Sequence, residues 1–431
     1  MNPLAQELNR ILEGTIVDKL LSDYGRRMYF PKGIISQSAE AKQKATKYNA
    51  TIGIATESGS PMYLPSIYSM FAHDGLTQNE IFPYAPTAGE MQLRKLWYED
   101  MLRKNPTMKD KKVSLPIVTS GLTHSISLVA SLFLEKNDTI LVPDMYWGNY
   151  NLTFVEQREA KMIQFPLFSN EALNIDGLEK AIDSLDSQKI NLILNFPNNP
   201  SGYSPKISEA QRLCEMLTKK AFEGKHLLVL LDDAYFDLFY EENLYRESLF
   251  SMLCDAHEHL FAVKGDAATK EEMVWGFRIG FLTFGAKGLT DSHYEALTKK
   301  TMGLIRGSVS SCSKPSQNLL IKAMQSPHRL EEKEMNVKQL AKRYHLLKTA
   351  LGKYAHNKHL VPLPFNSGYF MAFVCAGDAE ALRIHLLDTY KVGTISIQGT
   401  YLRLAFSSVD LEDIEDLVTL VYKGADEVFG A

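Results

Sequence analysis

The sequence of 431 residues lacks the marks of several protein classes. Its four cysteines are widely spaced and form no CxxC pair, which argues against a metal site and predicts reduced thiols in a cytoplasmic protein. The N-terminal segment has no apolar core of a signal peptide, and no stretch is apolar for long enough to cross a membrane. The formal net charge of -4 gives no basic excess that would attract nucleic acid or acidic lipid.

The sequence also lacks the glycine-rich loops of nucleotide-binding folds. No GxGxxG follows the first expected strand, and no P-loop is present, which argues against a doubly wound nucleotide-binding enzyme. We find no internal repeat, low-complexity tract or linker rich in Pro, Gly and Ser. The content of 45% hydrophobic and 23% charged residues is that of an ordinary globular protein.

Seven short apolar runs alternate with amphipathic stretches between about residues 110 and 285. The runs are LPIVTSG, TILVPD, KMIQFPL, INLILNF, LLVLLDD, LFAVKG and IGFLTFG. Several are almost wholly apolar, as strands buried on both faces are, and the stretches at residues 123–134 and 209–222 have helical character. This alternation predicts an α/β fold with a mostly parallel central sheet and helices on both faces.

The last hundred residues have a different pattern. Residues 329–351 form a charged helical segment, GYFMAFV and TYLRLAF resemble strands, and residues 410–429 form a helical tail. These features predict a smaller α+β domain, against which the N-terminal segment packs. Chains of this length normally divide into domains, so we expect a large domain at residues 75–325 and a small domain at residues 1–74 and 326–431.

Polar residues follow the apolar runs at the points where strands should end. They include Ser120, Gly121, Thr123, Trp147, Asn199, Asp232, Tyr235 and Lys270, and Arg278 comes directly before the seventh run. Ligands of parallel sheets bind outside the carboxyl ends of the strands. We therefore expect these residues, although distant in sequence, to converge at one edge of the sheet.

Lys270 and Arg278 lie eight positions apart in ATKEEMVWGFRIGF. A lysine in a desolvated, partly apolar setting could form a Schiff base with an aldehyde cofactor. The arginine could hold a phosphate through two parallel hydrogen bonds. The alternative is a solvated surface, which is the commoner setting of a lysine and an arginine at this spacing.

Two strand ends offer polar groups of other kinds. TSGLTHS follows a strand and opens a helix, so its backbone N–H groups could cradle a phosphate, or Thr123 or Ser120 could simply cap the helix. LLVLLDDAY ends in two acids, one of which could pair with a protonated pyridine nitrogen. The alternative for these acids is the capping of the next helix.

Each of three further segments allows two interpretations. NFPNNPSG is typical of a turn, although an Asn side chain on it could donate to a phenolic oxygen of a cofactor. Trp147 in MYWGNY could stack on a planar ring or pack in the core. Arg403 lies within the apolar strand TYLRLAF and needs an anionic partner, either a substrate carboxylate or a structural salt bridge.

Taken in order, these motifs resemble fold-type I pyridoxal-phosphate enzymes of the class I/II aminotransferase family, from about residue 52 to residue 409. YAPTAG at residues 84–89 resembles the family block Y-x-P-x-x-G, and YWGNY at residues 146–150 resembles T-W-G-N-H of aspartate aminotransferases. NPSG at residues 199–202 resembles N-P-T-G, and DDAY at residues 232–235 resembles D-x-A-Y. Lys270 and Arg278 have the spacing of the lysine and the phosphate-binding arginine of aspartate aminotransferases.

The resemblance implies pyridoxal 5'-phosphate as cofactor, no metal, and a role for each matched residue. Lys270 would hold the cofactor, with Thr269 beside it. The other implied cofactor contacts are Gly121, Leu122, Thr123 and Arg278 at the phosphate, Asp232 at the ring nitrogen, Trp147 on the ring face, and Asn199 and Tyr235 at the phenolic oxygen. Arg403 would bind the α-carboxylate of the substrate. Tyr84 would reach the phosphate of the neighbouring subunit, which implies a homodimer with active sites at the interface.

The sequence departs from the family pattern in two places. The family often has a serine phosphate ligand three residues before the lysine, where this chain has Ala267. The segment around Arg306, with Ser310 after it, resembles the one whose arginine binds the side-chain carboxylate of aspartate across the dimer interface, but the Asn-Pro-Pro that usually follows is absent. Lys264 is a rival for the Schiff base, and it lies too far from Arg278 to fit the pattern.

The implied function is transfer of an amino group between an L-amino acid, aspartate or aromatic, and a 2-oxo acid such as 2-oxoglutarate, by a ping-pong mechanism. Asp232 and Tyr235 would assist Lys270, which would act as general base and acid. The alternative on the same fold is a lyase, either a β-lyase or a decarboxylase. A regulator that binds the cofactor without turnover needs a DNA-binding domain, for which the first fifty residues show no basic face.

Overall fold

The computed structural model describes residues 1–13, 15, 21, 23–28, 34–51, 53–72 and 75–430. A seven-stranded sheet of strand order β4-β12-β11-β10-β9-β5-β6 forms its centre. The strands are β4 (Ile117–Thr119), β5 (Thr139–Pro143), β6 (Lys161–Phe165), β9 (Lys189–Asn195), β10 (His226–Asp232), β11 (Leu260–Ala267) and β12 (Gly280–Gly285). Each of the seven apolar runs supplies one strand, so the predicted α/β fold is confirmed.

One strand of this sheet reverses direction. β12 pairs antiparallel with both β11 and β4, whereas β10 is parallel to β9 and β11, and β5 is parallel to β6 and β9. The start of β12 therefore lies at the edge where the other strands end. This reversal brings Arg278, which directly precedes β12, to the same edge as the residues that follow β4 and β11.

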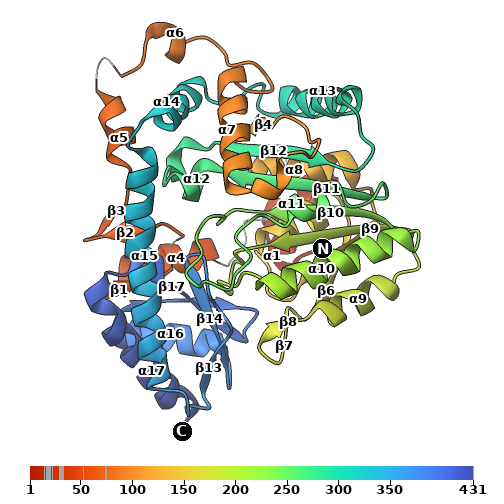
Figure 1. Cartoon of the computed structure of the whole chain (residues 1–431). Helices are drawn as coiled ribbons and strands as arrows, with labels where there is room; N and C mark the ends of the chain where they lie inside the picture. The colour runs from red at the N-terminus through yellow and green to blue at the C-terminus, as the bar shows by residue number, and fades with distance from the viewer. Residues whose placement is uncertain are drawn as a thin grey trace.

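Helices cover both faces of the sheet (Figure 1). Leu228 and Leu230 of β10 pack in one hydrophobic cluster with α8 (Leu122–Phe133). The alternate residues Leu227, Val229 and Leu231 pack in a second cluster with α9 (Ile175–Asp183) and α10 (Ile207–Phe222). Because successive strand residues point to opposite faces, this division shows that β10 is buried on both sides, as its apolar sequence predicts.

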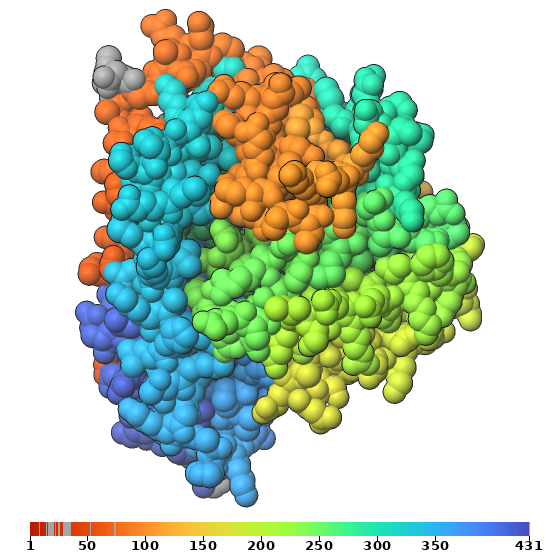
Figure 2. All heavy atoms as spheres, viewed as in Figure 1, coloured from red at the N-terminus to blue at the C-terminus, as the bar shows by residue number. Residues whose placement is uncertain are grey.

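A smaller antiparallel sheet has the strand order β13-β14-β17-β16. Its strands are β13 (Leu360–Pro362), β14 (Phe370–Cys375), β16 (Ile395–Ile397) and β17 (Tyr401–Ala405), and it lies with α16 (Ala379–Tyr390) and α17 (Ile414–Phe429). The long helix α15 (Arg329–Gly352) runs along the molecule from the large sheet to this smaller unit (Figure 1). On the face shown in Figure 2, α15 (cyan) lies beside α7 (orange; Met91–Lys104).

The N-terminal segment contacts both units. β1 (Tyr48–Asn49) pairs with β15 (Val392–Gly393), and α4 (Ile34–Lys44) lies against β15 and β16 of the smaller unit. In contrast, Arg27 of α3 (Asp23–Arg27) donates from Nε to the backbone oxygen of Glu156 at 3.2 Å, beside the large sheet. The expected domain boundary at residue 74 lies outside the described residues, and the division into domains stays a prediction.

Further helices and strands complete the described part of the chain. They are α1 (Pro3–Leu12), β2 (Thr56–Glu57), β3 (Ser60–Pro61), α5 (Pro65–Tyr68), α6 (Gln78–Ile81), β7 (Phe168–Ser169), β8 (Ala172–Leu173), α11 (Phe250–Leu253), α12 (Ala268–Glu271), α13 (Asp291–Ser308) and α14 (Lys314–Gln325). Within the described ranges, no helix combines the length and apolarity needed to span a bilayer.

Candidate active site

A cavity of about 220 Å³ lies at the carboxyl edge of the large sheet. Nine of the residues singled out from the sequence line it: Leu122, Thr123, Trp147, Asn199, Asp232, Tyr235, Thr269, Lys270 and Arg278. Eight of them lie at or directly after five separate strand ends, as the rule for parallel sheets predicts, and Arg278 precedes the start of β12. Asn195 and Ala234 complete the lining.

Lys270 presents a partly buried amine to this cavity. Its Nζ lies 4.5 Å from the centre of the Tyr235 ring, and it makes no hydrogen bond or ion pair within the described part of the chain. Burial lowers the pKa of Lys270 to about 8, helped by Arg278 and opposed by Asp232. A lysine in this state supplies free amine near neutral pH, as a Schiff-base nucleophile must.

The rival lysine, Lys264, has the opposite surroundings. It is buried on β11, and its Nζ lies 3.1 Å from Asp233 and 2.5 Å from Asp266. These carboxylates raise the pKa of Lys264 although burial alone would lower it. Lys264 does not line the cavity. This position agrees with its rejection as the Schiff-base lysine, which was based on its distance in sequence from Arg278.

Asp232 ends β10 and is almost completely buried. Burial raises the pKa of its carboxyl to about 6, while a hydrogen bond from the Tyr150 hydroxyl to Oδ2, at 2.5 Å, and the charge of Lys270 act in the opposite direction. Its Oδ1 accepts from the backbone N–H of Ala234 at 3.2 Å. The carboxylate is therefore held in a fixed orientation at the wall of a poorly solvated cavity.

Gly121 lies directly against Arg278, which lines the cavity. Gly121 precedes α8 with a φ of 84°, and a Cβ at this position would lie 2.3 Å from Nη2 of Arg278. Only glycine combines this left-handed backbone with such a close guanidinium. The N-terminus of α8 and a cation thus lie side by side, an arrangement that suits a phosphate.

Arg403 on β17 is the buried cation of the smaller sheet. Its Nη1 donates to Oδ1 of Asn199 at 3.0 Å, and its Nη2 donates to the backbone oxygen of Thr51 at 2.9 Å. Its Nε is buried without a partner, and no carboxylate of the described residues pairs with it. Burial lowers the pKa of Arg403 to about 10. The structural salt bridge considered from the sequence is thus not found among these residues.

Besides Gly121 and Arg403, two other residues singled out from the sequence do not line the cavity. Tyr84 is 90% exposed. Arg306 is exposed on α13, where its Nη1 donates to Oγ of Ser310 at 2.6 Å. Both were expected to act across a subunit interface, and a single chain does not test that expectation.

A second cavity, of about 490 Å³, adjoins the first at Asn199. Its wall includes Arg383, which is bound by Glu380 at 2.7 Å and by Glu40 at 3.0 Å. These two carboxylates neutralise the arginine, so the wall offers no unpaired cation among the described residues that line it.

The sequence reasoning missed two residues of the site. Tyr150 was quoted within a motif but was given no role, and it binds Asp232 directly. Asn195 ends β9, donates from Nδ2 to the backbone oxygen of Asp232 at 2.8 Å, and accepts from the N–H of Asn199 at 2.8 Å. The signal for Asn195 was its position as a polar residue at a strand end.

Comparison with known proteins agrees with this fold. The family model for aminotransferase class I and II matches residues 62–421. A probable aspartate/prephenate aminotransferase of Aquifex aeolicus is 23% identical over 262 residues, which are 58% of this chain and 60% of that protein. Aromatic-amino-acid aminotransferase 2 of Thermococcus litoralis is 25% identical over 201 residues, 46% of this chain and 48% of its own length. The chain therefore matches about half to three fifths of the length of these curated relatives.

Solved structures show the same fold over nearly the whole chain. An aminotransferase from Anaerococcus prevotii has a TM-score of 0.80 at 24% identity and covers 93% of this chain and 98% of its own. A kynurenine aminotransferase from Pyrococcus horikoshii has a TM-score of 0.79 at 16% identity, covering 98% of this chain and 100% of its own. Since the family model spans both sheets and every residue that lines the cavity, this chain belongs to the aminotransferase class I and II family.

Proposed function

We propose that the chain is a pyridoxal-phosphate-dependent aminotransferase that moves an amino group between an L-amino acid and a 2-oxo acid by a ping-pong mechanism. The observation that carries the proposal is Lys270, a partly buried lysine at the wall of the cavity whose amine has no hydrogen-bond or ion-pair partner among the described residues. Membership of the family supports it, as do relatives named aspartate, prephenate and aromatic aminotransferases.

The lining fits the parts of pyridoxal 5'-phosphate. Gly121 and Arg278 suit the phosphate, because a Cβ at Gly121 would fill the space beside the guanidinium. Asp232 suits the ring nitrogen, Trp147 the ring face, and Asn199 and Tyr235 the phenolic oxygen. Thr269 replaces the hydroxyl that Ala267 does not provide. When bound, the cofactor supplies an aldehyde that condenses with amines and a ring that withdraws electrons from the substrate.

Three residues of the chain would then have separate roles in the reaction. Arg403 binds the α-carboxylate of the amino acid through its planar guanidinium, whose Nε has no other partner. Lys270 moves the proton at the substrate Cα, since a pKa near 8 lets the amine both accept and return a proton near neutral pH. Asp232, ionised above a pKa of about 6, stabilises positive charge at the ring nitrogen.

We propose aspartate or an aromatic amino acid as the amino donor and 2-oxoglutarate as the acceptor. The described wall beside Asn199 offers no unpaired cation for a side-chain carboxylate, because Glu380 and Glu40 neutralise Arg383. Recognition of a dicarboxylic substrate would thus depend on Arg306 acting across the interface of a homodimer, in which the exposed Tyr84 would also be buried.

The division at residues 75–325 for the large domain, with 1–74 and 326–431 as the small domain, is part of the same proposal. The two separate sheets support it. The four cysteines are free and buried, which supports a reducing compartment such as the cytoplasm.

A visible absorbance scan tests the proposal. Protein incubated with pyridoxal phosphate should show a band that fades when aspartate or an aromatic amino acid is added and returns with 2-oxoglutarate. Lys270→Ala should abolish the band and turnover, whereas Lys287→Ala, at an exposed lysine after β12, should retain both. A normal band in Lys270→Ala would refute the assignment. Ammonia and a 2-oxo acid as sole products, without return of the band, would favour the lyase.

A further inference from the structure

Two acidic residues directly follow Lys270 in the chain. Glu271 and Glu272 have fully buried side chains, yet neither lines the cavity. A carboxylate that reached the cavity would stabilise the ammonium form of Lys270. Ion pairs on other elements fix both glutamates outside the cavity.

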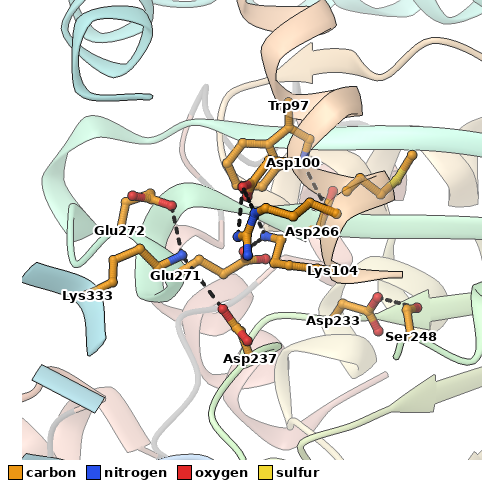
Figure 3. Close-up of polar contacts among 12 residues, drawn as sticks. Trp97, Asp100, Lys104, Asp233, Asp237, Ser248, Asp266, Glu271, Glu272 and Lys333 are labelled. Atoms are coloured by element: carbon orange, nitrogen blue, oxygen red, sulfur yellow. Dashed lines mark hydrogen bonds and ion pairs between the residues drawn. The ribbon is translucent and has the colours of Figure 1, made fainter. Parts of the chain in front are cut away.

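Cations of α7 and α15 pair with both glutamates (Figure 3). Glu272 accepts from Nε of Arg329 at 2.9 Å and lies 3.1 Å from Nζ of Lys333, both on α15. Glu271 pairs with Lys104 of α7. Asp100 of α7 lies 2.9 Å from Nζ of Lys104 and 3.2 Å from Nη2 of Arg329, and so joins the two helices.

Further charged residues lie on β11 and directly after β10. Lys264 lies between Asp233 and Asp266, Asp233 accepts from the Ser248 hydroxyl at 2.6 Å, and Asp266 accepts from Trp97 Nε1 at 3.0 Å. Figure 3 shows the contact between Asp233 and Ser248 and the indole of Trp97 beside Asp266. Asp233 directly follows Asp232, so the chain places an anchored acid after each of the two residues at the cavity.

We call these residues the buried charge cluster. Its five carboxylates are Asp100, Asp233, Asp266, Glu271 and Glu272. Its four cations are Lys104, Lys264, Arg329 and Lys333. Asp100, Glu271 and Glu272 have oxygens within 4.8 Å of one another, and the cations occupy the space between them.

The cluster is poorly arranged for stability alone. Oδ1 of Asp266 and Oε1 of Glu271 are buried and have no hydrogen-bond partner in the described part of the chain, and the carboxylates of the cluster outnumber its cations. Burial raises the pKa of Glu271 to about 7, with Lys104 and Lys333 acting against it. Buried ion pairs are commonly no more stabilising than apolar residues of the same volume, so a second role for this one is physically reasonable.

We propose that the buried charge cluster positions Lys270, because its cations draw Glu271 and Glu272 away from the cavity and fix the short helix α12 to α7 and α15. The inference rests on the proposed function of Lys270. Among the described residues of the cavity, the charges of Asp232 and Arg278 act on the amine, and the Tyr235 ring lies 4.5 Å from it. Lys104, Arg329 and Lys333 thus act through the two glutamates and not on the substrate.

Arg329→Met is the first test, read by the pH midpoint of the visible band of the cofactor-loaded protein. Each partner of Arg329 keeps another cation, Lys333 for Glu272 and Lys104 for Asp100, so both carboxylates stay ionised and the surroundings of Lys270 gain one negative charge. We expect the midpoint to rise by roughly one pH unit. The double variant Arg329→Met/Glu272→Gln restores the charge balance and should return the midpoint to the parent value.

Further variants separate charge from position and from stability. Arg329→Lys keeps the charge but cannot make the forked contacts with two carboxylates, so the midpoint should hold while kcat falls and KM for the amino acid stays. Lys220→Met is the matched control, a buried lysine of α10 with three carboxylate partners, and should move neither quantity. Should Arg329→Met fail to fold, Lys333→Met carries the same expectation, because Arg329 still pairs with Glu272.

The outcomes separate this inference from the proposed function. A band whose midpoint is the same in the parent protein, Arg329→Met and Lys333→Met would overturn the positioning role and leave the cofactor assignment standing. A raised midpoint that the double variant does not reverse would also overturn it. Absence of any band in the parent protein would refute the proposed function itself.

Discussion

The hydrogen bond from Tyr150 to Asp232 allows a quantitative prediction. The two oxygens are 2.5 Å apart and both residues are buried. A hydrogen bond to a charged group is worth about 1.5–3 kcal/mol, and about 1.4 kcal/mol corresponds to one pKa unit. Because this bond lowers the pKa of Asp232, which burial raises to about 6, Tyr150→Phe should raise that pKa by roughly one to two units.

The sign of the pH effect follows from the charge that the site needs. Asp232 pairs with a protonated ring nitrogen only when ionised, so Tyr150→Phe should weaken cofactor binding at pH 7 by about two- to tenfold. The deficit should grow as the pH falls and vanish above about pH 9, where the carboxyl ionises in both proteins. Cofactor titration of the apoprotein from pH 6 to pH 9, expressed as the ratio of variant to parent Kd, measures this directly.

A neighbouring tyrosine provides the control. Tyr146 stacks on Tyr150 with ring centres 6.4 Å apart, but its hydroxyl accepts from Asn151 at 3.1 Å and does not contact Asp232. Tyr146→Phe should therefore leave the ratio near one at every pH. If Tyr150→Phe also gives a ratio near one that does not change with pH, the electrostatic reasoning about Asp232 is wrong.

The remaining predictions concern three other parts of the site. Arg403→Met should raise KM for the amino acid roughly a hundredfold, because charged hydrogen bonds to the α-carboxylate are lost, and steady-state kinetics with an unchanged cofactor spectrum would establish this. Gly121→Ala places a methyl group 2.3 Å from the Arg278 guanidinium at a φ of 84°, so the free energy of unfolding should fall by about 1–3 kcal/mol and cofactor affinity should fall with it, as thermal melts and titration would reveal. Arg306→Met should raise KM for aspartate while KM for an aromatic substrate stays the same; equal changes for both would count against an interfacial carboxylate site.

Strand positions and most of the cavity lining could be predicted from the sequence because both follow from local patterns. An apolar run such as LLVLLDD carries its own evidence of burial on two faces, and the carboxyl-edge rule then places Asp232. The direction of β12 was not predicted, yet it is what brings Arg278 to the same edge as Gly121.

Contacts between distant segments were beyond the reach of pattern reasoning. Tyr150 lies 82 positions from Asp232, and nothing near either residue indicates that they meet. For Arg403, the sequence left a salt bridge and a substrate carboxylate both open, and the surroundings of its guanidinium contain no carboxylate partner among the described residues. Roles of the individual site residues, and the subunit interface expected around Tyr84, stay predictions.

The buried charge cluster shows a third limit. Arg329 and Lys333 lie four positions apart, which is the spacing of an ordinary solvated helix surface, and charged side chains are seldom buried. Their burial depends on partners from α7, α12 and α15 arriving together. No single segment contains that information.

The pairing of β1 with β15 has a consequence for synthesis of the chain. Tyr48 pairs with Val392, and the backbone oxygen of Thr51 accepts from Arg403, 352 positions later. The large sheet, by contrast, draws its strands only from residues between Ile117 and Gly285. During translation, the part of the site that carries Lys270 can form first. The part that carries Arg403 can form only after the residues of β15 and β17 have been synthesised. A chain that stops before β17 should therefore be able to order its central sheet without ever acquiring the arginine that recognises a substrate.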